Sequence, residues 1–474
     1  MLRQWNLHER KLILVTSMMI KTELYDYQSD AVEKLRHKTI GALYMEMGTG
    51  KTRTALELIK IRYDAGKVNA VLWLCPCSVK QNLKYDIIYH CDEKPDWLII
   101  KGIESLSSSD NLYMKLLEFV KTYNVYLIID ESNLVKNPHA KRTERITELS
   151  NHCKYKMILN GTPVSNNEAD MFAQWYILDW RVLGYKSYYS FAANHLEYRE
   201  IRRGNMKIQT DQIVRVLDVD YLTEKIEPFS YQIKKSDCMT LPAKCYRTMS
   251  FDMTFEQEQA YVNAKDEYLL NVDEFRSETI YKFFTALQHV TSGRRVTSQA
   301  TKRMTTEELF TRWYDNPRLC CLRDTIKDDI EYEQCIIFAK YKHEIAAIEE
   351  MLIELGYTYA EFTGNLTQKK RQESLKKFRD GTQFLIANKM CGAYGLNLQF
   401  CRNIIFYDND FDFATRSQAE DRVHRIGQTR EVHIYDIVAN NTIDEFISDN
   451  LQSKHSIVES FKKYLDKLKK KVQA

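Results

Sequence analysis

The stretch IGALYMEMGTGKTRTALELIKI, residues 40–61, decides the fold of the first half of this chain. An apolar run leads into a loop that contains Gly48 and Gly50, and apolar residues at helical spacing follow the loop. Glycine lets the backbone come close to a ligand, so successive N–H groups can surround phosphates at a helix N-terminus. The order of strand, glycine-rich loop and helix therefore predicts a nucleotide-binding unit of a parallel α/β sheet.

Three further positions of this loop bear on phosphate binding. Lys51 would reach the β- and γ-phosphates of a nucleotide, and Thr52 would place its hydroxyl on Mg²⁺. Met45 stands where the strict pattern has a glycine, so the short GTGKT run by itself could also be an ordinary turn. The strand before it and the helix after it favour nucleotide binding.

An acidic motif follows the apolar run VYLII, residues 125–129, where the expected buried strand ends. Asp130 would hold Mg²⁺, often through water, and Glu131 would polarise the attacking water. Acidic residues after a strand are often only a solvated turn or a helix cap. The presence of the Lys51 loop upstream favours catalysis of ATP hydrolysis.

The segment QAEDRVHRIGQTR, residues 418–430, sets Arg422 and Arg425 three residues apart, which predicts one shared helix face. A guanidinium is always charged and binds phosphate oxygens through a planar fork, so the pair suits the charge of a nucleoside triphosphate under hydrolysis. An exposed helix with salt bridges would show the same pattern. The two motifs upstream favour the catalytic interpretation.

Nine segments, in order, resemble the motifs of the Swi/Snf class of superfamily-two helicase-type ATPases, a class that includes double-stranded DNA translocases. The resemblance covers about residues 24–440. The segments are LYDYQSDAVEKL (24–35), MEMGTGKT (45–52), LWLCPCSVKQNLKYDI (72–87), DESNLVKNP (130–138), LNGTPVSNN (159–167), CIIFAKYKHEIAAIEEML (335–352), FTGNLTQKKRQESLKKF (362–378), ANKMCGAYGLNL (387–398) and QAEDRVHRIGQ (418–428).

The resemblance implies ATP and Mg²⁺ as cofactors and assigns roles to residues. The implied catalytic set is Lys51, Asp130, Glu131, Arg422 and Arg425, with Thr52 and Asp130 at the metal. The implied ATP-binding set is Tyr25, Gln28, Met47, Gly48, Thr49, Gly50, Lys51, Thr52, Gly395 and Gln418, with Gln28 against the adenine. The implied nucleic-acid contacts are Ser78, Lys136, Asn137, Lys340, Thr363, Gly364 and Lys389, each of which could also be a plain surface residue.

The chain departs from the family pattern at a few positions. Ser132 and Asn133 follow the acids where members commonly carry DEAH or DEGH, Ala393 replaces a glycine, and Lys234 and Lys235 replace paired arginines. Lysine keeps the charge and loses the planar fork. The DESN variant and the compact length favour the phage or bacterial members of the class.

Composition limits the other classes of protein. The formal net charge is +3, from 68 basic and 65 acidic residues, so a nucleic-acid surface must be a local groove. The eleven cysteines include no CxxC pair, which favours reduced, packed thiols in a cytoplasmic protein. Together with the likeness to phage or bacterial members, this implies the cytoplasm of a bacterium or of a phage-infected host. No apolar run approaches the roughly 20 residues of a membrane span.

The length of 474 residues suggests about three domain-sized units. We expect an α/β fold of two RecA-like, doubly wound parallel-sheet lobes with a helical insertion between them. The expected segments are an N-terminal extension (1–23), an ATP-binding lobe (24–228), a helical linker or insertion (229–320), a second lobe (321–450) and a basic C-terminal helix (451–474). Expected strands include ALYM, AVLWLC, VYLIID and KMILN in the first lobe and QCIIFAK, QFLIAN, NIIFYD and VHIYDIV in the second.

Three functions are compatible with these motifs. The first is an ATPase that translocates on duplex DNA, independently of sequence and without separating the strands. The second is a strand-separating helicase of replication or recombination, and the third is an ATP-controlled DNA clamp that serves a protein partner such as a nuclease. The second lobe shows no hairpin-like insertion that could act as a wedge, which favours the first. The aromatic cluster GYKSYYSF, residues 184–191, is expected to pack rather than to stack on bases.

Overall fold

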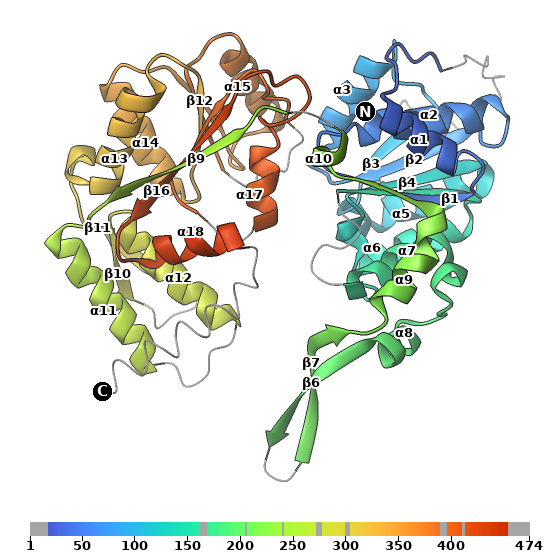
Figure 1. Ribbon diagram of the computed structural model, residues 1–474, viewed down its shortest axis with the longest axis horizontal. Helices are drawn as coiled ribbons and strands as arrows, with labels where there is room; N and C mark the ends of the chain where they lie inside the picture. The colour runs from blue at the N-terminus through green and yellow to red at the C-terminus, as the bar shows by residue number, and fades with distance from the viewer. Residues whose placement is uncertain are drawn as a thin grey trace. The chain divides into compact units, whose positions relative to one another are not determined.

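The computed structural model describes residues 18–161, 168–203, 206–238, 241–271, 277–298, 304–388, 396–409 and 413–453. The chain divides into two compact units, Met1–Thr240 and Leu241–Ala474 (Figure 1). Each unit is built on a six-stranded sheet in which every pair of neighbouring strands is parallel. The expected α/β class with two doubly wound lobes is confirmed.

The sheet of unit 1 has the strand order β3-β2-β4-β5-β1-β8. Its strands are β1 (Ile40–Met45), β2 (Ala70–Cys75), β3 (Leu98–Gly102), β4 (Val125–Asp130), β5 (Tyr155–Asn160) and β8 (Ser230–Ile233). All residues of β1 are buried, because successive side chains point to opposite faces of the sheet and each face is covered by a hydrophobic core. Ala42 and Tyr44 pack on one face of the sheet, and Leu43 and Met45 pack on the other.

Helices cover both faces of this sheet. The first face is covered by α1 (Asp26–Leu35), α2 (Lys51–Asp64) and α3 (Lys80–His90). The second is covered by α4 (Ser105–Ser108), α5 (Asp110–Thr122), α6 (Lys141–Asn151), α7 (Met171–Leu183), α8 (Tyr188–His195) and α9 (Val219–Ile226). The short α10 (Lys235–Cys238) follows β8. Phe191 of α8 is fully buried, so the expected packing of the GYKSYYSF cluster is confirmed, although Tyr189 is exposed.

An antiparallel hairpin of β6 (Leu196–Arg203) and β7 (Met206–Val216) leaves the body of unit 1 between α8 and α9 (Figure 1). Leu196, Tyr198, Ile213 and Val216 anchor its base in the core. In unit 2, β10 (Arg294–Ser298) and β11 (Thr305–Glu308) form a second antiparallel hairpin. This second hairpin lies within residues 229–320, the segment expected to be a helical linker or insertion, and outside the expected second lobe at residues 321–450.

The sheet of unit 2 has the order β13-β14-β12-β15-β16-β9. Its strands are β9 (Lys244–Phe251), β12 (Cys335–Phe338), β13 (Tyr359–Phe362), β14 (Phe384–Ala387), β15 (Asn403–Phe406) and β16 (Val432–Ala439). On one face lie α13 (Pro317–Thr325), the π-helical η5 (Ile326–Ile330) and α14 (Lys342–Glu354). On the other lie α15 (Gln368–Arg379) and α17 (Phe413–Glu420).

A third apolar cluster in unit 2 joins α11 (Phe255–Asn271), α12 (Ser277–Thr291) and α18 (Ile443–Ser453). Fully buried Arg318 of α13 ties this cluster to the sheet. Its guanidinium donates to the Asp444 carboxylate of α18 at 2.7 Å and to the Ile437 carbonyl of β16 at 3.1 Å. A buried charge of this kind is tolerated because it is paired and hydrogen-bonded.

The structure differs from the expected helical insertion at residues 229–320. The segment contains the expected helices α11 and α12, but β8 pairs with β1 in unit 1 and β9 pairs with β16 in unit 2. Both are edge strands in which only one residue is buried, so they lack the continuous apolar pattern of the central strands. The basic segment after Ser453 lies outside the described residues, and no helix within the described ranges is long and apolar enough to span a membrane.

Candidate functional site

The loop between β1 and α2 has the backbone of a phosphate-binding turn. Gly48 and Gly50 adopt φ angles of 82° and 85°, in the left-handed region that other residues rarely enter. Gly50 is the N-cap of α2, so Lys51 begins the helix. The first N–H groups of a helix have no partner within it, which makes this turn suitable for an anion.

Two side chains of α1 hold the loop in this shape. Gln28 Nε2 donates to the Thr49 carbonyl at 3.0 Å, and the Tyr27 hydroxyl donates to the same oxygen at 3.1 Å. A Cβ placed on Gly50 would lie 2.2 Å from Gln28 Nε2. Gln28 also accepts a hydrogen bond from the Tyr25 N–H at 3.1 Å. The structure thus shows Gln28 supporting the loop, while its contact with adenine stays a prediction.

The remaining expected loop residues lie on the same turn. The Lys51 ammonium donates to the Met45 carbonyl at 2.8 Å. Thr52 lies in the first turn of α2 and is half-buried, as is Met47 in the loop. A lysine held at the base of the loop is placed to meet phosphate oxygens, and the Thr52 hydroxyl is one helical position further on.

Asp130 and Glu131 lie at the carboxyl end of β4, and the parallel β1 ends at the same edge of the sheet. The Glu131 N–H donates to Asp130 Oδ1 at 3.0 Å, and Glu131 has a φ of 50°. Burial and then the charge of Glu131 raise the pKa of Asp130 to about 7, and the charge of Lys51 opposes this rise. The carboxyl group therefore lies in a place that favours an added positive charge.

The donor set at this edge fits Mg²⁺ and a nucleoside triphosphate. Mg²⁺ is commonly held by one or two carboxylates, phosphate oxygens and water, and here Asp130 and the Thr52 hydroxyl would be its protein ligands. The loop supplies backbone N–H groups and the Lys51 ammonium for the phosphates. The described residues contain no separate group of three or more histidine, cysteine or acidic side chains that could hold a metal ion.

A buried hydrogen bond links the acidic motif to α7. The Ser132 hydroxyl donates to Gln174 Oε1 at 2.5 Å, and Gln174 Nε2 donates to the Asp170 carbonyl at 2.9 Å. Both Ser132 and Gln174 are fully buried. We did not expect Gln174 from the sequence, because a single polar residue in an apolar helix resembles any satisfied core amide. The pair ties the acids to the helix that follows the β5 loop.

The expected nucleic-acid contacts of unit 1 lie on loops at the carboxyl ends of strands. Ser78 follows β2 and is half-buried. Lys136 forms an ion pair with Asp170 at 3.2 Å, and the exposed Asn137 accepts a hydrogen bond from the His139 N–H at 2.9 Å. Their part in nucleic-acid binding stays a prediction.

The expected contacts of unit 2 are less open. Lys340 Nζ donates to Gln288 Oε1 at 3.1 Å, and the Thr363 hydroxyl, which is 2 % exposed, donates to Glu361. Gly364 is exposed. Lys389 lies outside the described residues, as does Gly395 of the expected ATP-binding set.

Arg422 and Arg425 do not share a helix face, because α17 ends at Glu420 and both arginines lie in the turns that follow it. The Leu398 N–H donates to the Arg422 carbonyl at 3.0 Å. If the helix continued past Arg422, this carbonyl would instead accept a hydrogen bond from an N–H group of the same helix. The Arg425 guanidinium donates to the Leu396 carbonyl at 3.4 Å and to Asn397. The predicted helical pairing is therefore wrong, and the catalytic role of the two arginines stays a prediction.

Arg416 is the best-anchored cation of this region, and the sequence did not single it out. Its guanidinium binds both carboxylate oxygens of Asp436, at 2.6 and 3.0 Å, and Glu420 at 2.9 Å, and it lies over the Phe406 ring. Burial alone would raise the pKa of Glu420, but Lys244 and Arg416 outweigh it and lower the value. Gln418, expected at ATP, is half-buried on the same helix.

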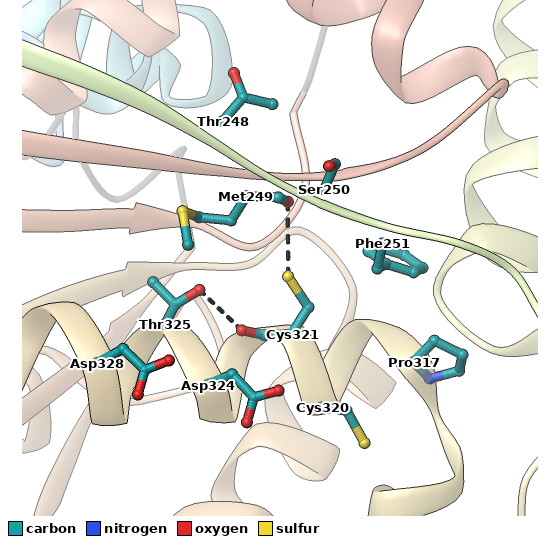
Figure 2. A pocket seen from close by; sticks show the side chains of 10 residues that line it. All are labelled: Thr248, Met249, Ser250, Phe251, Pro317, Cys320, Cys321, Asp324, Thr325 and Asp328. Atoms are coloured by element: carbon teal, nitrogen blue, oxygen red, sulfur yellow. Dashed lines mark hydrogen bonds between the residues drawn. The ribbon is translucent and has the colours of Figure 1, made fainter.

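A cavity of about 440 Å³ lies elsewhere, between β9 and α13 of unit 2 (Figure 2). It is lined by Met249, Phe251, Pro317, Cys321 and Asp324, among others. The Cys321 thiol donates to the Met249 carbonyl at 3.6 Å across it. It contains none of the residues expected to bind ATP or nucleic acid.

Three family models match the chain. The model described as "SNF2-related domain" matches residues 96–301, "Helicase conserved C-terminal domain" matches residues 318–427, and "Type III restriction enzyme, res subunit" matches residues 21–80. The first two follow one another along the chain and cover parts of both units.

Similar proteins carry related names. The "Uncharacterized ATP-dependent helicase" of Mycoplasma pneumoniae is 25% identical over 471 residues, covering 92% of this chain and 42% of the relative. The "Uncharacterized ATP-dependent helicase YqhH" of Bacillus subtilis is 24% identical, covering 93% of this chain and 79% of the relative. The "TATA-binding protein-associated factor MOT1" of Saccharomyces cerevisiae is 23% identical, covering 90% and 27%. The chain thus spans less than half the length of several relatives.

A solved structure titled "Sulfolobus solfataricus SWI2/SNF2 ATPase core in complex with dsDNA" is also similar to this chain. The identity is 22%, the TM-score is 0.41, and 93% of each chain is covered.

Proposed function

We propose that this chain, which belongs to the Snf2 class of superfamily-two helicase-type ATPases, is a motor that couples ATP hydrolysis to movement along duplex DNA. One observation carries the proposal. At one edge of the unit 1 sheet, the Gly48–Gly50 turn and Lys51 lie with Asp130 and Glu131, and the charge of Lys51 acts on Asp130. This is the set of groups that phosphoryl transfer from a nucleoside triphosphate requires.

The residues of the chain divide the chemistry between them. The loop N–H groups and Lys51 bind and orient the phosphates, and Thr52 with Asp130 would hold Mg²⁺, which supplies positive charge to the reacting phosphate. Glu131 orients the attacking water and accepts its proton. Arg422 and Arg425 come from unit 2, so in this proposal they complete the site only when the two units close on ATP. Removal of such arginines typically costs ~10³–10⁵ in rate.

Movement follows from closure and release of the two units. Both would hold the nucleic-acid backbone, through Ser78, Lys136 and Asn137 in unit 1 and Lys340, Gly364 and Lys389 in unit 2. Each ATP cycle changes the distance between the two grips, so the protein advances along the strand. Contacts to phosphate and sugar do not carry sequence information directly, so the motor is expected to act on any sequence.

The names of the relatives support this proposal without fixing its details. Two of those reported above are named ATP-dependent helicases. This chain spans less than half the length of several relatives, so the activities of the whole relatives are not carried over to it. A protein partner such as a nuclease belongs to the proposal only in the alternative of an ATP-controlled DNA clamp.

A second candidate function is separation of DNA strands. The hairpin β6–β7 favours it, because it is a two-stranded projection of the kind that can split a duplex (Figure 1). A forked duplex distinguishes the two functions. Loss of strand separation after β6–β7 is shortened, with ATP hydrolysis retained, would assign unwinding to that hairpin.

The ATPase rate measured with no nucleic acid, single-stranded DNA, duplex DNA and RNA tests the proposed function. We expect duplex DNA to give the highest rate and the stimulation to fall steeply with added salt, because phosphate contacts release counterions. A rate that no nucleic acid increases, or that RNA increases most, would exclude the duplex DNA motor.

A further inference from the structure

The arginine segment, residues 421–428, has no helix or strand of its own, so its position depends on contacts with other parts of unit 2. On one side, the Leu398 N–H donates to the Arg422 carbonyl at 3.0 Å, and Gln428 Nε2 donates to the Cys401 carbonyl at 2.9 Å. Such single bonds fix a turn less firmly than the continuous hydrogen bonding of a helix or sheet. Contacts on the other side of the segment therefore help to decide where its arginines lie.

The other side of the arginine segment lies against the chain where it enters unit 2. The entry segment, residues 242–246, follows the division between the two units and runs into β9. His424 Nε2 donates to the Pro242 carbonyl at 2.8 Å, and the Val432 N–H donates to the Ala243 carbonyl at 3.0 Å. β9 then continues beside β16 as the outermost strand of the sheet (Figure 1).

Glu420 joins the arginine segment to the entry segment through its buried carboxylate. It is the last residue of α17 and is 5 % exposed. Its Oε2 accepts hydrogen bonds from the Lys244 ammonium and from the Tyr246 hydroxyl, both at 2.8 Å, and its Oε1 accepts one from Arg416 Nε at 2.9 Å. Burial opposes ionisation of this carboxyl group, but Lys244 and Arg416 outweigh burial and lower its pKa. Glu420 is therefore a carboxylate at neutral pH.

The two oxygens of Glu420 are held by different strands. Arg416 also binds both carboxylate oxygens of Asp436 on β16, so Oε1 is tied to β16. Lys244 and Tyr246 belong to β9, so Oε2 is tied to the entry segment. A single attachment would let the end of α17 rotate about it, whereas attachments to two strands fix its direction. The bonds from β9 thus orient the point at which the chain turns into the arginine segment.

We propose that Lys244 and Tyr246 are positioning residues for ATP hydrolysis, which act on the arginine segment through Glu420. This proposal rests on the proposed ATP motor and assigns further residues to its site. Arg422 lies two positions after Glu420, so a change in the direction of the α17 end moves this arginine. The entry segment is in this way part of the arginine site, although Lys244 and Glu420 are 176 positions apart in the sequence.

The kinetic signature of a positioning residue follows from the role of the arginines. A misplacement of about 1 Å can cost about 100-fold in rate, even when the change is far from the reacting atoms. The arginines would stabilise charge that develops in the transition state, whereas the phosphate loop of unit 1 binds ATP itself. Loss of the Lys244 contact should therefore lower kcat and leave the KM for ATP nearly unchanged. A residue that only stabilises the fold would lower the Tm and leave the kcat of the folded protein at the parent value.

Two variants of β9 provide a matched comparison in the full-length protein. Lys244→Met removes the cation that pairs with Glu420 and keeps an apolar side chain in its place. Arg247→Met is the control, because it removes a cation of the same strand that pairs with Asp329 of η5 instead. The kcat and the KM for ATP are measured with saturating duplex DNA, and the Tm is measured for each variant.

Lys244→Met should lower kcat about 10- to 100-fold and change the KM for ATP by less than about twofold. Arg247→Met should keep the parent kcat. Lys244→Arg restores a cation opposite Glu420 and should recover most of the lost rate. Equal kcat values in Lys244→Met and Arg247→Met, or a loss that appears only in KM, would overturn the proposal and leave the motor intact. A parent protein without ATPase activity would overturn both.

A third variant keeps the test decisive if Lys244→Met does not fold. Tyr246→Phe removes one oxygen from a side chain that is 55 % exposed, so the fold should be retained. It should lower kcat about 3- to 10-fold, the worth of one hydrogen bond, with the KM for ATP unchanged. A parent kcat in folded Tyr246→Phe, or a Tm that falls while kcat does not, would show that these bonds stabilise the fold and do not position the arginines.

Discussion

Replacement of Gly50 by Ala tests how the phosphate loop is held. Gly50 has a φ of 85°, and its added Cβ would lie 2.2 Å from Gln28 Nε2, the atom that donates to the Thr49 carbonyl. In the variant, alanine must therefore adopt the left-handed backbone conformation of residue 50, and its Cβ must also displace the Gln28 amide that supports the loop. Gly66→Ala is the matched control, because Gly66 has a φ of 64° and no atom lies within 4 Å of its added Cβ.

The expected magnitudes follow from these two costs. A left-handed backbone with a Cβ costs about 1–2 kcal/mol. Displacement of Gln28 leaves the Thr49 carbonyl with one hydrogen bond fewer, which costs about 1–3 kcal/mol in a buried position. Gly50→Ala should thus lower the free energy of unfolding of unit 1 by about 2–5 kcal/mol, and Gly66→Ala by about 1–2 kcal/mol.

Urea unfolding and the affinity for a fluorescent ATP analogue measure the two effects. Gly50→Ala should lose nucleotide affinity, and Gly66→Ala should keep it. The double variant Gln28→Ala with Gly50→Ala removes the clash, so its loss of stability should be smaller than the sum of the two single losses. Equal losses in Gly50→Ala and Gly66→Ala, or strict additivity in the double variant, would refute the role assigned to Gln28.

Three further results are expected. Lys51→Ala and Glu131→Gln should both abolish ATP hydrolysis, but only Lys51→Ala should weaken ATP binding, because the Glu131 amide leaves the pocket intact; hydrolysis by Glu131→Gln at the parent rate would exclude Glu131 as the catalytic base. Ser132→Ala leaves the buried Gln174 Oε1 without its hydrogen-bond donor, so it should lower the free energy of unfolding of unit 1 by about 1–3 kcal/mol. An unchanged Tm in thermal unfolding would contradict this. Burial and the neighbouring Asp408 raise the pKa of Glu344 to about 7. The folded state therefore binds this proton more tightly than the unfolded chain, so stability should fall as pH rises from about 4.5 to 7, and Glu344→Gln should flatten the pH profile of Tm in that range.

The central parts of both units could be predicted from the sequence because their strands are buried on both sides. Runs such as VYLIID and VHIYDIV have few polar interruptions, and the structure places them in β4 and β16. The phosphate loop could be predicted because glycine, lysine and threonine occur at fixed spacing between a strand and a helix. These signals are local, so one sequence is enough to detect them.

The edge strands and the arginine turn could not be predicted because their structure depends on distant partners. β9 has exposed residues along its length and is a strand only because β16 lies beside it. The 418–430 segment has a helical pattern, but the Leu398 N–H bonds to the Arg422 carbonyl and α17 ends before the arginines. The sequence contains no local signal for either contact.

The displacement of a third DNA strand from a triplex on an otherwise intact duplex tests the motor most directly. The assay uses the full-length protein with ATP, and Glu131→Gln serves as the control that binds ATP without hydrolysing it. We predict ATP-dependent displacement of the third strand by the parent protein and none by Glu131→Gln. Duplex-stimulated ATP hydrolysis without displacement of the third strand would contradict translocation and favour a clamp.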